Sequence, residues 1–340
     1  MKPFLAFAVT LLLVGGAAWY GHRALDLAPS EFEIHQVVEI PADASFKTVA
    51  GLLAQKGLIV SPFWFRLLGK VQDAERKIKP GEYDFHTRMR PPEILEALVK
   101  GKVIQYSVVI PEGFTAYQVG KVLHALSLAD DASIIRLVRA PEFAKSLGID
   151  AASLEGYLFP DTYYFPRRTK PEDILKTMVG RFRQVYTPDL QARATAINMT
   201  EREVVTLASI IEKETGQDDE RPLISAVFHN RLRKKYPLQS DPTVVYEIPE
   251  FDGKWTHALL ARRTPYNTYT HPGLPPGPIA NPGLKSLVAA LHPAPVPYLY
   301  FVSKNDGSHQ FSSTLDEHNR AVNRYQKKSG QPTAGRKEKG

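Results

Sequence analysis

The clearest pattern of hydrophobic and polar positions lies in the stretch LASIIEKETG, residues 207–216. Thr200 followed by Glu203 forms a capping box, which predicts that a helix starts there. Apolar side chains then recur at helical spacing and form one stripe: Val204, Leu207, Ala208 and Ile211. At about 100° per residue, Glu214 projects onto the apolar side and Glu212 falls at its edge. Because residues i and i+2 do not face each other, these two glutamates cannot act as a pair in one cleft.

A carboxyl group against apolar neighbours has a chemical use. Burial disfavours the charged form, and this suits a proton donor near neutral pH. The alternative at this point is that Glu212 and Glu214 are both solvated at the end of an ordinary helix. The pattern alone leaves both interpretations open.

The first residues form a long uncharged run. Nothing between Lys2 and His22 carries a charge, and this length can just span a bilayer as a helix. A cleaved signal peptide is the rival interpretation, but Trp19 and Tyr20 resemble an interfacial aromatic belt and no clean A-x-A site follows. We predict a single-pass membrane anchor over residues 1–22, with a short cytoplasmic end and the rest of the chain exported.

A weak internal repeat follows the anchor. The stretches 38–41 (VEIP) and 108–111 (VVIP) align without gaps at an offset of 70 residues. The pairs that continue this alignment are Ser45 with Thr115, Val49 with Val119, and Leu53 with Leu123. Each copy predicts a short strand, a tight turn and a helix that starts after the hydroxyl residue. In the first copy a second apolar stretch and a second strand follow, and this β-α-α-β order resembles a LysM-like module, a small fold often used to bind cell-wall glycan.

An aromatic block interrupts the helical region that comes next. Residues 154–166 (LEGYLFPDTYYFP) lie between a glycine and two prolines, so we expect a loop or an extended segment. One interpretation is a packed corner between domains. The other is a platform for sugars, because aromatic faces stack on the apolar faces of pyranose rings.

Composition narrows the chemistry. The 340 residues are 43% hydrophobic and contain no cysteine, which excludes disulfides and thiolate chemistry. Residues 327–340 hold +4 of the formal net charge of +7, and we predict a disordered basic tail there. The body has no basic stripe with interleaved aromatics, so we do not expect nucleic-acid binding. The histidines match no metal-ligand spacing, and we predict neither a metal nor a cofactor.

The loops after residue 200 carry neutral hydrogen-bonding side chains beside aromatic rings. This is the chemistry of carbohydrate recognition more than of phosphate or metal binding, and loops this long are seldom idle. The residues that we expect to hold a glycan are Gln239, Asp241, Asn267, Tyr269 and Asn281. For each of them, a hydrogen bond that only structures the loop is the alternative.

With these residues in view, the chain resembles the endolytic murein transglycosylases of the MltG (YceG-like) family. The resemblance rests on several strings in order, namely EGYLFPDTY, LASIIEKET, QSDPTVVY, YNTY, GLPPGPIANPG, PYLYFVS and HQFSSTLDEHNRAV. It implies an enzyme of the inner (cytoplasmic) membrane that faces the periplasm or the outer surface. Such an enzyme cuts peptidoglycan between N-acetylmuramic acid and N-acetylglucosamine and leaves a 1,6-anhydro end. It also implies that Glu214 is catalytic, because in lytic transglycosylases the catalytic glutamate ends a helix and precedes a small hydroxyl residue, here Thr215.

The expected fold class is α+β. We divide the chain into an anchor over 1–22, the LysM-like module over 30–104, a second α+β and helical region over 105–195, a mixed helix and loop catalytic domain over 196–326, and the tail over 327–340. The expected partners are peptidoglycan strands, the cytoplasmic membrane and peptidoglycan synthases. A non-catalytic wall-binding scaffold stays open as an alternative, as does a hydrolytic muramidase that uses Glu214 with Asp241.

Overall fold

A computed structural model describes residues 2–248 and 250–326, with side chains from residue 10 on. The chain divides into two compact units. Unit 1 consists of residues up to 107 together with 164–169, and unit 2 of residues 108–163 and the part from 170 on. The chain therefore passes between the units three times, after residues 107, 163 and 169. The domain bounds expected from the sequence stay a prediction. The predicted tail over 327–340 lies outside the described residues.

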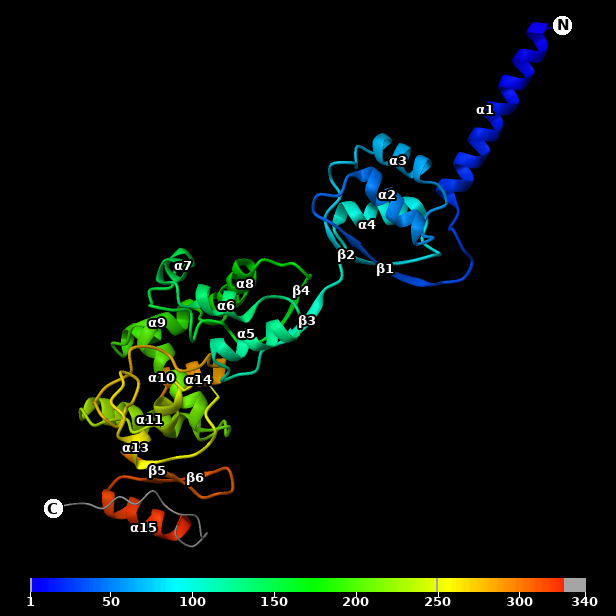
Figure 1. Cartoon of the computed structure of the whole chain (residues 1–340). Coiled ribbons are helices and arrows are strands. Elements are labelled where there is room, and N and C mark those ends of the chain that lie inside the picture. Colours follow the sequence, from blue (N-terminus) through cyan, green and yellow to red (C-terminus); the bar gives the residue numbers. More distant parts are fainter. Residues whose placement is uncertain (1, 249, 327–340) are drawn as a thin grey trace. The chain divides into compact units, whose positions relative to one another are not determined.

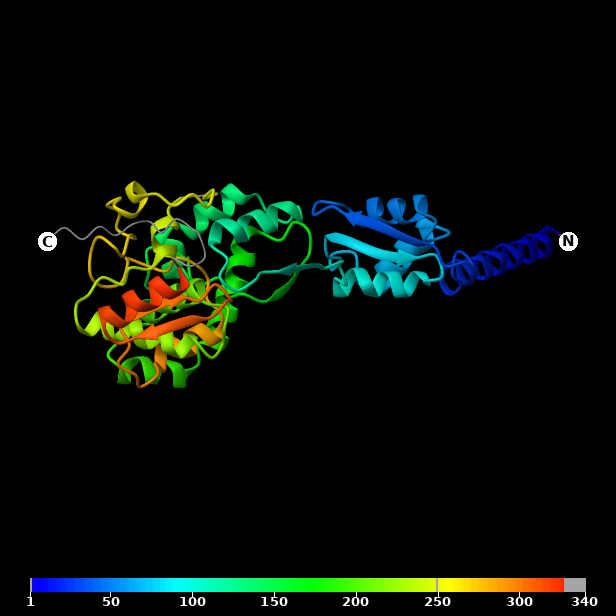
Figure 2. The same ribbon diagram turned by 90° about the horizontal axis from the view of Figure 1, so that it is seen from below.

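Unit 1 is a two-stranded sheet covered by helices on one face. Its elements are α1 (Lys2–Asp26), β1 (His35–Ile40), α2 (Phe46–Gln55), α3 (Pro62–Val71), β2 (Gly81–His86) and α4 (Pro91–Lys100). The strands are antiparallel, with Val38 opposite Tyr83. Figure 1 shows α2, α3 and α4 on one side of this strand pair. In Figure 2, seen from below, the two strands lie in front of the helices. The buried side chains of the strands face these helices and form one core with Val49, Leu53 and Phe65.

The β-α-α-β order predicted for the first copy of the repeat is therefore present, with Ser45 as the N-cap of α2. The likeness to LysM modules stays a prediction. No helix within the described residues combines the length and the apolar character needed to cross a membrane. The predicted anchor, which falls on α1, is thus not confirmed.

The second copy of the repeat begins like the first, with a strand, a capped helix and a turn, and has three helices before its second strand instead of two. Its elements are β3 (Tyr106–Val109), α5 (Ala116–Ala125), α6 (Asp131–Val138), α7 (Pro141–Ser146) and β4 (Thr162–Phe165). The residues after α2 and α5 agree at the offset of 70: Gly57 and Ser127 both have a positive φ, of 67° and 54°. In each copy the next leucine is buried and donates its backbone N–H to a leucine carbonyl in the helix, Leu58 to Leu53 and Leu128 to Leu123. Thr115 caps α5 as expected.

The rest of unit 2 is helical, with long loops and one hairpin. Its elements are α8 (Pro171–Val185), α9 (Pro188–Ala196), α10 (Glu201–Glu214), α11 (Arg221–Arg233), α12 (Asp241–Val245), α13 (His257–Leu260), α14 (Leu284–Leu291), β5 (Tyr300–Ser303), β6 (His309–Ser312) and α15 (Leu315–Tyr325). Helix α10 packs against α9, α11, α12 and α14. The mixed α+β fold class is confirmed by these elements.

The aromatic block over 154–166 is mostly core. Tyr157, Phe159 and Tyr163 are buried, and the Tyr157 ring lies edge-on to Phe182 of α8. These rings are therefore committed to packing inside the protein. This packing lies within unit 2 and counts against a platform for sugars.

Candidate active site

Helix α10 positions the candidate acid. The predicted capping box is present, because Glu203 donates its backbone N–H to Thr200 and its side chain accepts the N–H of Thr200. Every residue from Val204 to Ile211 is buried, which fixes the helix in the middle of unit 2. The helix ends at Glu214, and Thr215 is already extended. The last helical residue, Glu214, is thus held at the end of a helix whose middle is packed in the core.

The Glu214 carboxyl is enclosed by protein and bonded to a neutral group. Only a minor part of the residue is accessible to solvent. Its Oε1 accepts a hydrogen bond of 2.5 Å from the Ser240 hydroxyl. Burial raises the pKa of Glu214 to about 7, the negative charge of Asp241 adds to this, and the Ser240 hydrogen bond and Arg231 oppose it. A carboxyl group with this pKa carries its proton in a large fraction of molecules at neutral pH.

The loop that carries Ser240 is fixed by one buried arginine. Arg231 of α11 donates to the backbone carbonyls of Pro237 and Leu238 and to Oε1 of Gln239. Gln239 itself has a φ of 54°, an unusual backbone conformation for a side chain of this type. Backbone strain of this kind persists only where the surroundings enforce it, and here the bonds from Arg231 hold the loop. That arrangement places Ser240 against Glu214.

Two further loop residues complete the same site. Tyr269 donates its hydroxyl to Oδ1 of Asp241 at 2.5 Å. Burial and the charge of Asp241 raise the pKa of Tyr269, so this tyrosine is a hydrogen-bond donor at neutral pH. We call Glu214, Ser240, Asp241 and Tyr269 the acid site. Gln239, Asp241 and Tyr269 are thus brought together around Glu214, and Asp241 is exposed at the start of α12.

Asn267 and Asn281 occupy different surroundings from the other three expected residues. Asn267 is 1% exposed, donates to the carbonyls of Leu260 and Arg262, and accepts the N–H of Tyr269. Asn281 is fully buried and uses both ends of its amide within the protein. Neither side chain presents a free polar atom to a ligand. Asn267 acts on the acid site indirectly, because it holds the backbone of Tyr269.

Asn281 belongs to a second buried carboxyl site. Glu155 accepts hydrogen bonds from the Asn281 amide, the backbone N–H of Ala116 and the Tyr246 hydroxyl. Burial raises the pKa of Glu155 to about 7. These bonds join the start of α5, the aromatic block and the residue after α12. Nothing in the local sequence marks Glu155, because its partners lie 39 to 126 residues away.

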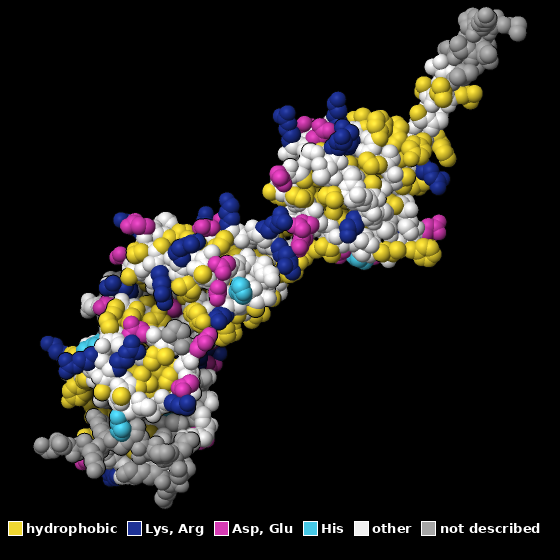
Figure 3. Space-filling view, viewed as in Figure 1, with side chains coloured by type: hydrophobic (Ala, Val, Ile, Leu, Met, Phe, Trp, Pro, Cys, Tyr) yellow, Lys and Arg dark blue, Asp and Glu magenta, His cyan; other side chains and the backbone are white. Residues whose placement is uncertain are grey.

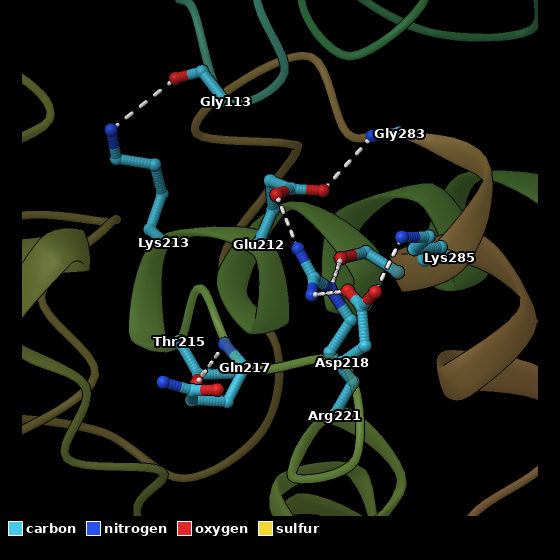
Figure 4. Close-up of polar contacts among 10 residues, drawn as sticks. Gly113, Glu212, Lys213, Thr215, Gln217, Asp218, Arg221, Gly283 and Lys285 are labelled. Atoms are coloured by element: carbon cyan, nitrogen blue, oxygen red, sulfur yellow. Dashed lines mark hydrogen bonds and ion pairs between the residues drawn. The ribbon is translucent and has the colours of Figure 1, made fainter. Parts of the chain in front are cut away.

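Glu212 lies on the other side of the helix end, in a cluster of opposite charges (Figure 4). Its carboxylate accepts from Arg221 at 3.1 Å and from the backbone N–H of Gly283 at 3.0 Å. The Glu212 and Arg221 side chains are each 6% exposed. Arg221 also bonds Asp218 at 2.6 Å, and Asp218 pairs with Lys285. We call Glu212, Asp218, Arg221 and Lys285 the ion-pair cluster.

A cavity and a cluster of possible metal ligands are further candidate ligand sites among the described residues. A cavity of about 630 Å³ lies beside the first half of α10 and includes Arg202, His229 and Arg233, but none of the acid-site residues lines it. Side-chain atoms of His124, Asp130 and Asp131 that could coordinate a metal ion lie close together near the start of α6. Asp130 there is engaged as the N-cap of that helix. Neither feature touches the acid site.

Comparison with known proteins covers almost the whole chain. The sequence model of the YceG-like family matches residues 38–324 of this chain. The chain is 32% identical to an endolytic murein transglycosylase of Bacillus subtilis, over 92% of this chain and 91% of that protein. It is 26% identical to an endolytic murein transglycosylase of Streptococcus pneumoniae serotype 2, of which it spans 65%. A crystal structure of a yceG-like protein from Listeria monocytogenes superposes with a TM-score of 0.58 and 34% identity, covering 85% of this chain and 99% of that one.

Proposed function

Because the chain belongs to the YceG-like family, we propose that it cuts peptidoglycan strands internally, between N-acetylmuramic acid and N-acetylglucosamine, and that Glu214 is the acid and base of this reaction. Its relatives are named endolytic murein transglycosylases. The chain is accordingly a lytic transglycosylase, a lyase that acts on polysaccharide. The observation that supports the assignment of Glu214 is its pKa of about 7 at the fixed end of α10.

The reaction proceeds in two proton transfers. Protonated Glu214 gives its proton to the glycosidic oxygen, and the bond between that oxygen and the muramyl anomeric carbon breaks. The carboxylate then takes the proton of the muramyl 6-hydroxyl, whose oxygen attacks the same anomeric carbon and forms the 1,6-anhydro ring. No water is consumed, and Glu214 ends protonated as it began. A single carboxyl group is sufficient because the nucleophile is tethered to the reacting sugar.

The neighbours of Glu214 suit this cycle. The Ser240 hydroxyl orients the carboxyl, and its hydrogen bond favours the carboxylate that receives the second proton. The Asp241 charge favours the protonated form that starts the reaction. Gln239 and Tyr269 are held at the same place and are the residues that we expect to contact the glycan. In this proposal Asn267 and Asn281 support the loops and do not touch the substrate.

The position of Asp241 also supports a second candidate, a hydrolytic muramidase. An exposed carboxylate whose charge acts on Glu214 could activate a water molecule on the other face of the sugar. The two reactions leave different ends. Lytic cleavage leaves a muramyl residue that is one water lighter than the reducing sugar left by hydrolysis.

Digestion of purified peptidoglycan by the full chain in detergent, followed by mass spectrometry, separates the candidates. We expect anhydro ends, and none from a matched preparation of Glu214→Gln. Reducing ends would replace the proposal with hydrolysis by Glu214 and Asp241. Retention of glycan without any cleavage would favour a binding scaffold instead.

The cellular setting is part of the same proposal. The uncharged run over residues 3–21 supports a membrane anchor, with the remaining chain on the periplasmic side. An anchored enzyme of this kind would act on new strands beside the synthases and terminate their growth. The LysM-like module over 30–104 would hold the glycan. Labelling of an introduced cysteine by a membrane-impermeant reagent in intact cells tests the orientation.

A further inference from the structure

Helix α3 of unit 1 is apolar on two opposite sides. The inner side carries Phe65, which is 1% exposed and stacks on Phe46 in the core. The outer side carries Phe63, Leu67 and Val71, which are 66%, 40% and 77% exposed. An α-helix of a small soluble module normally leaves its outer side polar. The apolar outer side of α3 is therefore a candidate contact surface for another molecule or a membrane.

Two cations lie on this same side. At about 100° per residue, Phe63, Leu67 and Val71 together with Arg66 and Lys70 fall within an arc of about 140°. Helix α3 contains no acidic residue. Neither Arg66 nor Lys70 makes a side-chain hydrogen bond or ion pair with any described residue. We call these five residues the α3 surface. Figure 3 shows hydrophobic side chains near the top of unit 1, with Lys and Arg side chains and some Asp or Glu side chains beside them.

The α3 surface adjoins the N-terminal helix. Helix α1 packs against α3, and Gly21 approaches Trp64 so closely that an added Cβ would lie 2.9 Å from the indole ring. The Phe63 ring in turn meets Trp64 edge-on, with the ring centroids 5.4 Å apart. Leu12 and Val14 of α1 are 76% and 61% exposed. Exposed apolar side chains thus occur both on α1 and on the helix that packs against its C-terminal part.

We propose that the α3 surface rests on the headgroup region of an anionic lipid bilayer. The inference rests on the membrane anchoring of α1 in the proposed function, since the contact between α1 and α3 brings this surface to wherever α1 is held. Aliphatic and aromatic side chains enter the acyl boundary, and flanking Lys and Arg bind anionic headgroups. Glycan is a poorer occupant, because Leu67 and Val71 offer nothing to sugar hydroxyls.

A single-cysteine experiment tests this placement, because the chain contains no cysteine of its own. The full chain is reconstituted in nanodiscs of phosphatidylcholine and phosphatidylglycerol at a ratio of about 3:1, which supplies the anionic surface. An environment-sensitive dye is attached at Val71→Cys, and doxyl-labelled lipid serves as the quencher. Val37→Cys is the matched control, since Val37 is 56% exposed but lies on the face of β1 turned away from the helices. Leu12→Cys reports on α1 itself.

We expect the Val71 dye to shift to the blue and to be quenched several-fold more than the Val37 dye. The double variant Arg66→Glu and Lys70→Glu is expected to reduce quenching at Val71 and leave quenching at Leu12 unchanged. Equal, weak quenching at Val71 and Val37 with strong quenching at Leu12 would overturn the α3 proposal and leave the anchor standing. Absence of quenching at Leu12 would overturn both.

The enzymatic proposal is tested separately in the same preparations. Each variant is incubated with isolated peptidoglycan in detergent, where the bilayer has no part. If the unlabelled chain fails to cleave while the Val71 dye is still buried in lipid, the assigned reaction falls and the α3 surface stands. If cleavage is normal and Val71 stays exposed to water, the α3 proposal falls and the assigned reaction stands.

Discussion

Two glutamates at the end of α10 show how one residue type acquires opposite properties two positions apart. Glu212 accepts hydrogen bonds from Arg221 and from a backbone N–H in the ion-pair cluster. Glu214 accepts one from the neutral hydroxyl of Ser240 in the acid site, and burial raises its pKa to about 7. The first carboxylate is compensated as an anion, whereas the second is stabilised in its neutral form.

The two glutamates therefore have different roles, one structural and one chemical. The ion-pair cluster ties the end of α10 to α11 and α14, so it holds the acid site still without entering it. A buried ion pair is costly to desolvate, and it is strongly destabilising only when one partner is removed. The acid site, in contrast, needs a carboxyl group that can release and recover a proton.

The largest effect is expected from Glu214→Gln. The amide is nearly isosteric but cannot donate a proton to the glycosidic oxygen, so the rate of cleavage should fall by about 10³-fold or more. The midpoint of thermal denaturation should not fall, because no charged partner is left unpaired. Release of anhydro-muropeptides, measured by mass spectrometry, and circular dichroism check the two parts. Turnover near that of the parent chain would remove Glu214 from the mechanism.

Glu212→Gln should show the opposite profile. It leaves the buried Arg221 without its compensating anion on that side, which should lower the free energy of unfolding by about 3 kcal/mol. The rate of cleavage per folded molecule should change little, because Glu212 lies outside the acid site. A double-mutant cycle with Arg221→Met isolates the energy of the pair. A loss of activity with unchanged stability would show that the two glutamates are not divided in this way.

A pair of substitutions beside Glu214 should shift the pH profile in opposite directions. The general acid must be protonated, so kcat/KM should fall as the pH rises through about 7, the pKa of Glu214. Asp241→Asn removes a charge that raises this pKa, so the fall should begin at lower pH. Ser240→Ala removes a hydrogen bond that lowers it, so the fall should begin at higher pH.

A shift of one pH unit corresponds to about 1.4 kcal/mol. These effects are therefore smaller in free energy than those expected for Glu214→Gln and Glu212→Gln. Initial rates between about pH 5 and pH 9 on solubilised peptidoglycan fragments would resolve them. Shifts of the same sign for both variants would contradict the assigned causes. A loss of all activity in Asp241→Asn at every pH would instead favour the hydrolytic mechanism.

The local features of this site follow from the sequence. A capping box is formed by neighbours in the chain, so Thr200 and Glu203 predict the start of α10 without knowledge of the fold. The side of the helix on which Glu214 lies follows from the helical period. The repeat also follows from local sequence. Val49 and Val119 are both buried in helices that begin after a capping hydroxyl residue.

The long-range features do not follow from it. Ser240 lies 26 residues after Glu214, and no local rule says that its hydroxyl reaches that carboxyl. Asn267 and Asn281 looked like ligand contacts because they are amides in polar loops. Buried backbone groups also need partners, and both amides serve these instead. Glu155 was missed because its environment is made by chain segments far apart in the sequence.

The smallest effect is expected at the exposed edge of the ion-pair cluster. Asp218 is 57% exposed, and its partner Lys285 is 63% exposed. Lys285 lowers the pKa of Asp218, so this carboxylate contributes stability above its unfolded-state pKa that is lost as the pH falls through the folded value. Asp218→Asn should therefore lower the denaturation midpoint at neutral pH far less than Glu212→Gln does, and less again in high salt. If it were as damaging as Glu212→Gln, burial would not be what distinguishes the two anions that Arg221 holds.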